Sequence, residues 1–477
     1  MAADGSVHER VDRALPPVGH PLADLPSPRQ FRAAAARAAS PAARAEIART
    51  STPRARRAAA RTVRDELKAL LRSGQIDAEE QREYRAIYDT ALKVRTRLSS
   101  SRGAALQGVI NNTNFMAGRG DLTASRLPAI FTTLRRNTEW WQTGRLLSYG
   151  ERVEFNDSEL VWQYYPGEGI QLQVLGTFGK ANGLWMAKDR ARLANVLDEM
   201  SALASTRGGA YAWEYYFYFG GGRPPWASAM AQATGVQAFA RASQLLRKPA
   251  YLATAKRAIK LFELGATTGV GVKTSAGRRY LLYSFAPSQQ VLNAFVQTLV
   301  GLNDYWEISR DERARRLFVA GEKQARLDLA ATDTGAWSLY QVGGSESDLS
   351  YQELVTGFIH NLCDRAEIRF WCQADERFRR YLKEPPALEL TTRRVQAGKT
   401  TLVRFRVSKM SKVGLTIKRS GSTALATSAT VSRGSHGYTW RVPSSPGSYE
   451  VVLSGTDLAG NFGRTTATIT VVGKART

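Results

Sequence analysis

The chain has 477 residues, which predicts two or three domains, and its hydrophobic content of 43% is enough for a buried core. The net charge of +25 is uneven, because residues 386–477 carry 14 Lys and Arg against 3 Asp and Glu (+11), and residues 1–110 carry 20 against 12 (+8). A basic protein attracts polyanions, but the chain contains no nucleic-acid-binding motif, so we expect no specific nucleic-acid partner.

The first 60 residues are rich in Ala, Arg and Pro. This composition predicts a basic segment that is largely disordered or marginally helical. Residues 1–28 lack the basic and apolar regions of a signal peptide. Apolar runs long enough to cross a bilayer are also missing, so we expect no transmembrane segment.

Residues 61–385 are expected to form a helical (α/α) domain. Apolar residues such as Leu67, Leu70, Tyr88 and Leu92 recur at three- and four-residue spacing. The stretch from 145 to 181 differs, because LLSYGERVEF and GIQLQVLGTF are rich in alternating, β-branched and aromatic residues. That pattern predicts a small β-hairpin inserted in the helical domain.

Between residues 187 and 382 the chain forms a loose repeat. Each repeat predicts an apolar helix, a short polar turn and a more amphipathic helix, as in QQVLNAFVQTLVGLNDYWEI followed by DERARRLFVAGEKQARLDL. Stacked hairpins of this kind predict a mainly α fold, an incomplete (α/α) toroid. The loops at one end would shape a groove suited to a chain-like substrate.

Two cysteines, Cys363 and Cys372, are nine positions apart. They could be two buried thiols, or a disulfide that joins a helical hairpin in an oxidising compartment. The four histidines, at positions 7, 20, 360 and 436, are scattered. We therefore expect no metal site built from His or Cys.

Residues 386–477 contain seven short strand-like segments separated by turn residues, from LELTTRRV to GRTTATITVV. This rhythm predicts an immunoglobulin-like (Ig-like) β-sandwich. The closing PGSYEVVLSGTDLAGN resembles bacterial Ig-like modules appended to secreted enzymes, a resemblance that implies a secreted or cell-surface protein.

Motifs for nucleotide-dependent, zinc-hydrolase and serine-hydrolase chemistry are missing from the sequence. The run AYAWEYYFYFGGGRPPW (210–226) holds more aromatic residues than one strand face can bury. Sugars stack on aromatic faces and arginine pairs with carboxylates, so Trp213, Trp226 and Arg223 are candidate substrate-binding residues. The alternative is an ordinary buried strand.

Four segments in register carry a resemblance to a known family: PPWASAMAQATGVQAFARA (224–242), YSFAPSQQVLNAFVQTLVGLNDY (283–305), DTGAWSLY (333–340) and SYQELVTGFIHNL (350–362). They resemble the carboxy-terminal domain of the D-glucuronyl C5-epimerases, which include the heparan sulfate and heparosan epimerases. The resemblance implies an isomerase that inverts C5 of a uronic acid, D-glucuronate to L-iduronate, within an acidic polysaccharide. It implies no cofactor.

The C5 proton lies next to a carboxylate and is weakly acidic, so its removal needs a base on one face and a proton donor on the other. By the resemblance, three tyrosines take the catalytic roles: Tyr283, Tyr340 and Tyr351. Asn293, in VLN, matches a substrate-binding asparagine.

The sequence departs from the family's pattern at three places near these tyrosines: Leu282, Gln341 and Gln352. An acidic residue, an arginine and a histidine, respectively, are expected there. The missing arginine leaves the substrate carboxylate without its partner, and three residues could replace it: Arg223, Arg278 and Arg279.

Two other functions share features with this one. A polysaccharide lyase begins with the same proton abstraction and then expels the C4 substituent, and a non-catalytic protein could bind acidic glycans without turnover. The sequence leaves open the polymer, its modification, the oligomeric state and the route of export.

Overall fold

The structure is a computed structural model that describes residues 61–473. The chain divides into two compact units, Met1–Arg326 and Leu327–Thr477, and the division falls within helix α12 (Glu312–Thr332). The domain boundary expected at 385 lies inside the second unit, and the segment predicted for residues 1–60 lies outside the described residues. Within residues 61–473, the helices are all too short or too polar to span a bilayer.

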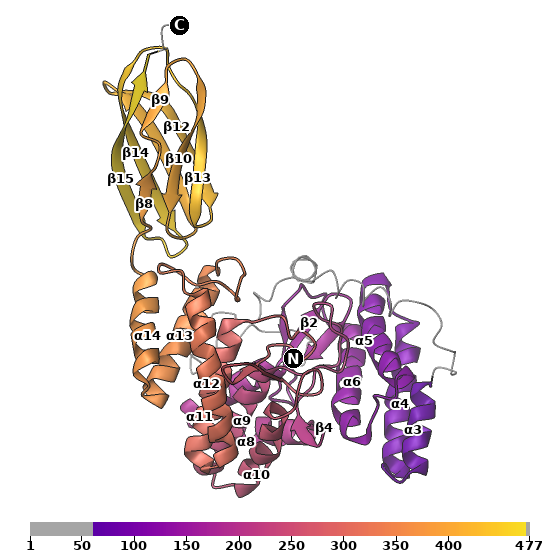
Figure 1. The fold of residues 1–477 in the computed structure, drawn as a ribbon. Helices are drawn as coiled ribbons and strands as arrows, with labels where there is room; N and C mark the ends of the chain where they lie inside the picture. The colour runs from indigo at the N-terminus through magenta and orange to yellow at the C-terminus, as the bar shows by residue number, and fades with distance from the viewer. Residues whose placement is uncertain (1–60, 474–477) are drawn as a thin grey trace. The chain divides into compact units, whose positions relative to one another are not determined.

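The described part of the first unit opens with helices, as expected for residues 61–385 (Figure 1). They are α3 (Val63–Arg72), α4 (Ala78–Arg95), α5 (Ser100–Gly118), the 3-10 turn η1 (Ala124–Arg126) and α6 (Leu127–Thr143). Capping boxes start α3 and α4: Thr62 pairs with Asp65, and Asp77 pairs with Glu80. Such caps satisfy the free N–H groups of a first turn.

A three-stranded antiparallel sheet follows, in the order β1 (Arg152–Val153), β2 (Trp162–Tyr165) and β3 (Gly169–Leu172). This confirms the β insertion, but its predicted end at 181 is wrong. The second half of GIQLQVLGTF begins helix α7 (Val174–Met186). Its buried residues Val174, Thr177, Phe178 and Ala181 recur at three and four positions, so packing on one helix face outweighs local β-preference.

Helical hairpins then follow in the first unit. They are α7 with α8 (Arg190–Ala202), α9 (Ala229–Leu245) with α10 (Pro249–Ala258), and α11 (Leu292–Ser309) with the start of α12. Helix α9 packs between α7 and α11, and Gly321 of α12 lies against Leu299 of α11. Helices α9 and α11 are buried almost all round, whereas α10 buries one stripe, as expected for inner and outer helices. The hairpin repeat is confirmed, and the (α/α) toroid stays a prediction.

Short elements connect these hairpins. They are β4 (Ser205–Arg207), β5 (Ala210–Ala212), the 3-10 turn η2 (Ile259–Phe262), β6 (Gly271–Lys273) and β7 (Arg278–Tyr280). The pairs β4–β5 and β6–β7 are antiparallel ribbons. Each ribbon ends next to a segment that carries candidate site residues.

The second unit opens with helix α13 (Leu349–Ala366) and helix α14 (Arg369–Tyr381), which pack together. Cys363 of α13 and Cys372 of α14 form a disulfide, so the second of the two alternatives for these cysteines is the one observed. Glu367 between the helices adopts the left-handed conformation at φ 52°.

The rest of the second unit is a β-sandwich of two sheets. One sheet has the order β13-β10-β8 and the other β12-β11-β14-β15-β9. The strands are β8 (Leu388–Leu390), β9 (Arg394–Gln396), β10 (Thr400–Val407), β11 (Ser411–Arg419), β12 (Ser422–Val431), β13 (Gly434–Arg441), β14 (Gly447–Asp457) and β15 (Phe462–Val472). The first predicted strand is thus divided between the two sheets.

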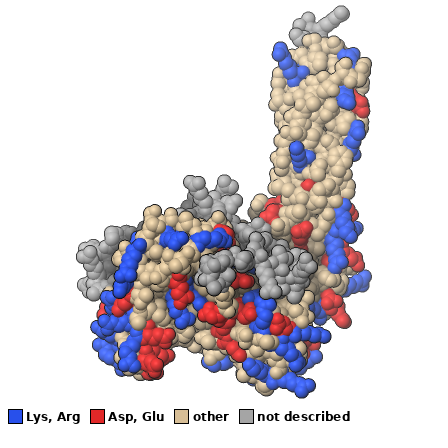
Figure 2. Space-filling model, turned by 180° about the vertical axis from the view of Figure 1, so that it is seen from behind, with Lys and Arg blue, Asp and Glu red and all other residues tan. Residues whose placement is uncertain are grey.

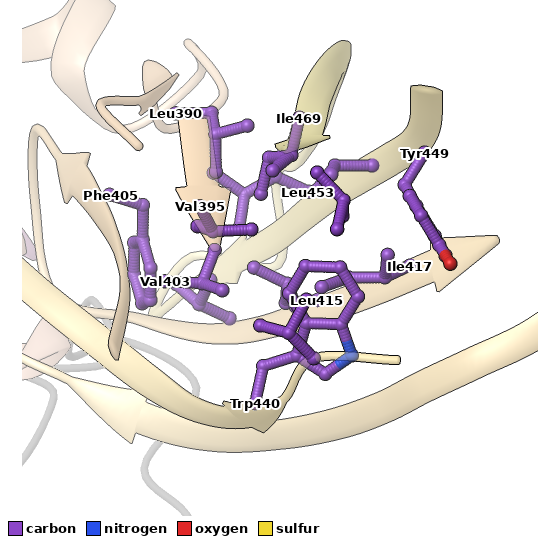
Figure 3. Close-up of a cluster of buried hydrophobic side chains, with 14 of the residues drawn as sticks. Leu390, Val395, Val403, Phe405, Leu415, Ile417, Trp440, Tyr449, Leu453 and Ile469 are labelled. Atoms are coloured by element: carbon purple, nitrogen blue, oxygen red, sulfur yellow. The ribbon is translucent and has the colours of Figure 1, made fainter. Parts of the chain in front are cut away.

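The sandwich core comes from alternate residues of both sheets (Figure 3). Phe405 and Trp440 from one sheet meet Leu415, Leu453 and Ile469 from the other, and all are at most 2% exposed. On the face seen in Figure 2, the sandwich shows several Lys and Arg and few Asp or Glu. The two-sheet architecture is observed, and the Ig-like classification stays a prediction.

Candidate active site

The aromatic run predicted to bind substrate (residues 210–226) starts in β5 and continues as a tight loop before α9. This loop is called the aromatic excursion. Tyr215 and Trp226 exchange backbone hydrogen bonds of 2.8 and 3.1 Å, and their rings stack with centroids 4.1 Å apart. Gly222 near the tip has no side chain, and a Cβ there would lie 2.3 Å from the Phe285 ring. The glycines therefore allow a second aromatic segment to approach.

That second segment carries Tyr283. The clamp formed by Ala227 and Ser284 holds it in place, because Ser284 N–H donates to the Ala227 carbonyl at 2.8 Å and Ala227 N–H donates to Ser284 Oγ at 3.1 Å. The Tyr283 ring stacks on Phe285 at 5.4 Å and meets Trp226 edge to face at 5.6 Å. Tyr283 is 2% exposed.

Tyr283 and the aromatic excursion line one small cavity, of about 20 Å³. Its other walls include Tyr165, Gln173 and Ser228. A space of this size holds about one water molecule, not a sugar ring. The cavity is therefore closed to substrate in this structure.

Two further phenols of this cavity are joined through one amide. Gln173 Nε2 donates to the Tyr165 hydroxyl at 2.7 Å, and the Tyr215 hydroxyl donates to Gln173 Oε1 at 3.3 Å. Burial raises the pKa of both Tyr165 and Tyr215 well above the usual value for a phenol. Both side chains are neutral hydrogen-bonding groups at physiological pH.

A buried ion cluster that sequence reasoning missed supports the start of this excursion. Glu214 is 3% exposed and accepts from Arg126 at 2.7 and 3.1 Å, from Arg207, and from Ser205 Oγ at 2.7 Å. The Tyr216 hydroxyl donates to the same carboxylate at 3.2 Å. Burial acts to raise the pKa of Glu214, but the attraction of the two guanidinium groups outweighs burial and the pKa is lowered.

The other predicted residues of the first unit take different places. Trp213 is 2% exposed, stacks on Phe239 with centroids 5.3 Å apart and donates to the Met200 carbonyl at 2.7 Å, so it is part of the helical core. Asn293 is buried in the first turn of α11, where its Oδ1 accepts from the Ala294 N–H at 2.6 Å.

Among the three candidate partners of a substrate carboxylate, Arg223 is the exposed one. It forms no ion pair with the described residues and lies close enough to Tyr218 to lower the pKa of that phenol, against a larger rise from burial. Arg278 donates to the Glu263 and Leu264 carbonyls and so stabilises a loop. Arg279 is half-buried in β7, opposite Val272.

The second unit brings the two remaining tyrosines together. The Tyr351 hydroxyl donates to the Tyr340 hydroxyl at 3.2 Å, and the rings meet edge to face with centroids 4.5 Å apart. Asp348 caps α13 by accepting from the Tyr351 N–H at 2.8 Å, which places Tyr351 in the first turn. Burial raises the pKa of Tyr340 to about 12, and Asp348 adds to the rise while the Tyr351 hydroxyl opposes it.

Tyr340 lies on a short loop that several buried groups support. Leu339 and Glu346 form an antiparallel bridge, and Tyr340 N–H donates to the Ser345 carbonyl at 2.9 Å. Gln352, where the family pattern has histidine, is fully buried and its Oε1 accepts from Ser338 N and Oγ at 2.9 and 2.7 Å. Gln352 therefore anchors the loop.

The sandwich also supports this loop, from within the same unit. Glu346 is 9% exposed and accepts from the backbone N–H groups of Met410 and Arg433 at 2.9 and 2.7 Å. Lys409 Nζ is buried beside Asp457 at 2.6 Å and lies 5.2 Å from the Trp337 ring centroid. No sequence pattern pointed to these contacts.

Of the predicted catalytic residues, Tyr340 and Tyr351 thus meet in one unit and Tyr283 lies in the other. The convergence of all three stays a prediction. Gln341, another departure from the family pattern, follows Tyr340 directly. Residues 61–473 contain no cluster of His, Cys, Asp and Glu that could hold a metal ion.

Comparison with known proteins finds a family model and a curated relative that match part of the chain. Residues 207–380 match the family model described as the D-glucuronyl C5-epimerase C-terminus. A D-glucuronyl C5-epimerase of Caenorhabditis elegans is 30% identical over 133 residues, which is 25% of this chain and 21% of the relative. The chain therefore spans about a fifth of that relative's length.

Solved structures give weaker matches. A sugar epimerase from a ruminal bacterium has a TM-score of 0.33 at 12% identity, covering 44% of this chain and 59% of that one. A polysaccharide lyase has a TM-score of 0.34 at 11% identity, covering 63% and 84%.

Proposed function

We propose that the protein is a C5-epimerase acting on uronic acid residues of an acidic polysaccharide, because residues 207–380 match the family model described as the D-glucuronyl C5-epimerase C-terminus. The observation that carries the proposal is the hydrogen-bonded pair of Tyr340 and Tyr351, inside the matched residues. The proposed reaction is D-glucuronate to L-iduronate.

The reaction needs one proton to leave C5 and another to arrive on the opposite face. The C5–H bond breaks, its proton goes to a base, and its electron pair moves into the carboxylate to form an enediolate-like state. A donor then forms a new C5–H bond. General acid–base catalysis of this kind contributes about 10²–10⁴-fold.

The electrostatics of the tyrosine pair support a donor role for Tyr340. A phenol with a pKa of about 12 stays protonated at neutral pH. Since Tyr351 donates to the Tyr340 oxygen, the Tyr340 proton is available for another acceptor. We assign proton donation to Tyr340, its support to Tyr351, and proton abstraction from the other face of the sugar to Tyr283, whose small cavity must widen to admit the sugar.

The substrate carboxylate needs a cation, because neutralising it stabilises the enediolate-like state. Arg223 suits this role better than Arg278 or Arg279, since it is exposed and makes no ion pair with the described residues. Its neighbours Tyr218 and the glycines 220–222 are at the tip of the aromatic excursion. No cofactor enters this scheme.

We further propose that the protein acts outside the cell or on its surface. The Cys363–Cys372 disulfide supports this location, because disulfides persist mainly in oxidising compartments. At the cell surface the enzyme would have access to a glycan that contains uronic acid residues. Thiol titration of protein isolated from the native host, with and without reductant, tests the location.

Incorporation of solvent deuterium at C5 tests the reaction. Heparosan incubated with the full chain in D₂O should gain deuterium and iduronate without loss of chain length. A lyase would instead shorten the polymer and create an unsaturated sugar with new ultraviolet absorbance. Binding with neither change would identify a glycan-binding protein and overturn the proposal.

A further inference from the structure

A second feature of the first unit fits an acidic ligand, at a place separate from the aromatic cavity. An open hollow of about 370 Å³ lies where α10, η2 and the β4–β5 turn meet the start of α12. Its lining residues are Gly209, Ala253, Lys256, Arg257, Lys260 and Arg313. None of them lines the cavity around Tyr283. Figure 1 shows α10 beside α9 and near β4.

Two of the four cations are held in place by neighbouring groups. The Arg257 guanidinium carbon lies 3.3 Å from the centroid of the Tyr211 ring, a stacking that restrains the side chain. Arg313 pairs with Asp311 at 2.8 Å and also donates to the Lys256 carbonyl at 3.4 Å. Their donors are therefore ordered before any ligand arrives.

The two lysines have no such partners. Lys256 and Lys260 are exposed, lie four residues apart on the α10–η2 segment, and form no ion pair among residues 61–473. Two ammonium groups this close in sequence repel each other, and an anion bound between them would relieve the repulsion. Gly209 leaves the Lys260 ammonium unobstructed, since a Cβ there would lie 3.1 Å from Nζ.

The charge balance of the hollow is positive. Its four cations face two carboxylates, Asp311 and Glu263, whose charges both act on Arg313, and four minus two leaves +2. The volume lies at the lower end of ligand sites, roughly 300–1,000 Å³. Ordered guanidinium groups beside flexible ammonium groups suit an oxyanion carried on a larger molecule.

We propose that this hollow binds the sulfate or carboxylate groups of an acidic polysaccharide, outside the cavity that Tyr283 lines. The choice of a polysaccharide over other polyanions rests on the proposed function. Such a site holds a long polymer on the enzyme between turnovers. It would also account for a cluster of basic side chains that lies outside the cavity around Tyr283.

The test compares Lys256→Gln/Lys260→Gln with Lys93→Gln/Arg97→Gln in the full chain. The second pair removes the same charge from exposed positions of α4 and its end. Binding of heparin is measured over a range of salt concentrations. Each cation that contacts a single-stranded polyanion contributes about 0.7 to the slope of log K against log salt, so the first variant should reduce the slope by about 1.4.

We expect the first variant to bind heparin about tenfold more weakly at low salt and the control to stay within twofold of wild type. Equal losses in both variants, or none in either, would overturn the proposal. So would tighter binding of single-stranded DNA of matched charge that Lys256→Gln/Lys260→Gln abolishes, because the hollow would then be a nucleic-acid site. The assay needs no turnover, so it is independent of the deuterium experiment.

Discussion

The Tyr351 hydroxyl donates its hydrogen bond to the Tyr340 hydroxyl, at 3.2 Å, across ten intervening residues. This hydrogen bond fixes the orientation of the two phenol groups within the second unit. Because Tyr340 accepts this bond, its own proton can point elsewhere. The catalytic proposal can therefore be tested by removing single oxygen atoms.

Tyr351→Phe should lower epimerase turnover by about 10²-fold or more, because it removes the donor that orients Tyr340. The ring remains, so the edge-to-face contact and the unfolding temperature should change little. Tyr438→Phe is the matched control, since it removes a phenol oxygen that bonds to the Val413 carbonyl in the sandwich. Deuterium incorporation into heparosan is the measurement, and wild-type rates in both variants would refute the assignment.

Stability should fall at alkaline pH as a consequence of the buried phenols. Burial raises the pKa of Tyr340 to about 12 in the folded chain, against about 10 for an exposed phenol. The stabilisation is complete below pH 10 and is lost as pH rises from about 10 to 12, because the unfolded chain releases the proton first. Tyr84, Tyr305 and Tyr381 have pKa values raised to about 12 in the same way.

Urea unfolding at a series of pH values between about 8 and 12 checks this prediction. Phenolate absorbance followed in parallel should rise together with unfolding. An unfolding free energy that does not change across this interval would contradict the raised pKa values. Tyr340→Phe should remove part of the pH dependence.

Glu346 provides a test of how the sandwich supports the tyrosine loop. Glu346→Ala leaves the N–H groups of Met410 and Arg433, which are partly buried, without their acceptor, at a cost of at most about 1–3 kcal/mol each. The loop that carries Tyr340 should loosen, so kcat should fall about tenfold while KM changes less. Glu346→Gln keeps one acceptor oxygen and should recover part of both losses.

The matched control is Glu389→Gln, at an exposed position of β8. It should alter neither kcat nor unfolding temperature. Loss of stability in Glu346→Ala with full kcat would limit Glu346 to a structural role. Restored activity in Glu346→Gln would show that the hydrogen bonds, not the charge, position the loop.

Much of this fold follows from local pattern. Helices α3 and α4 begin at Thr62 and Asp77, where capping residues precede an apolar period, and the strands of the sandwich alternate between core and solvent. Tyr340 and Tyr351 are eleven positions apart, so a loop followed by a helix brings them together. The disulfide joins cysteines nine positions apart at the ends of adjacent helices.

The rest depends on contacts that local pattern cannot specify. Glu214 and Arg126 are 88 positions apart, and Glu346 and Arg433 are 87 apart. Val174 begins a helix although its neighbours favour a strand, because burial against α9 decides between two apolar patterns of similar local preference. Trp213 was expected to contact a ligand, but its side chain packs against Phe239 inside the helical core.

Glu214 gives the sharpest stability prediction. Glu214→Gln removes the carboxylate that Arg126 and Arg207 share, and leaves two largely buried guanidinium groups without their counter-charge. Breaking a buried pair in this way costs about 3–5 kcal/mol, far more than a surface ion pair. The loss should appear in urea unfolding at neutral pH, and Glu312→Gln, which disrupts an exposed pair with Arg315, should cost less than about 1 kcal/mol.

The pH dependence of the unfolding free energy of the wild type should also reflect the Glu214 carboxylate. The pKa of Glu214 is lowered in the folded chain because attraction to the two arginines outweighs burial, so its stabilisation is present above the ordinary glutamate pKa of about 4.3 and is lost as pH falls below that value. Glu214→Gln should flatten this acid limb of the stability curve. If the variant unfolds at wild-type urea concentrations and keeps the same acid limb, the cluster does not stabilise the aromatic excursion, and Tyr216 must be positioned by packing alone.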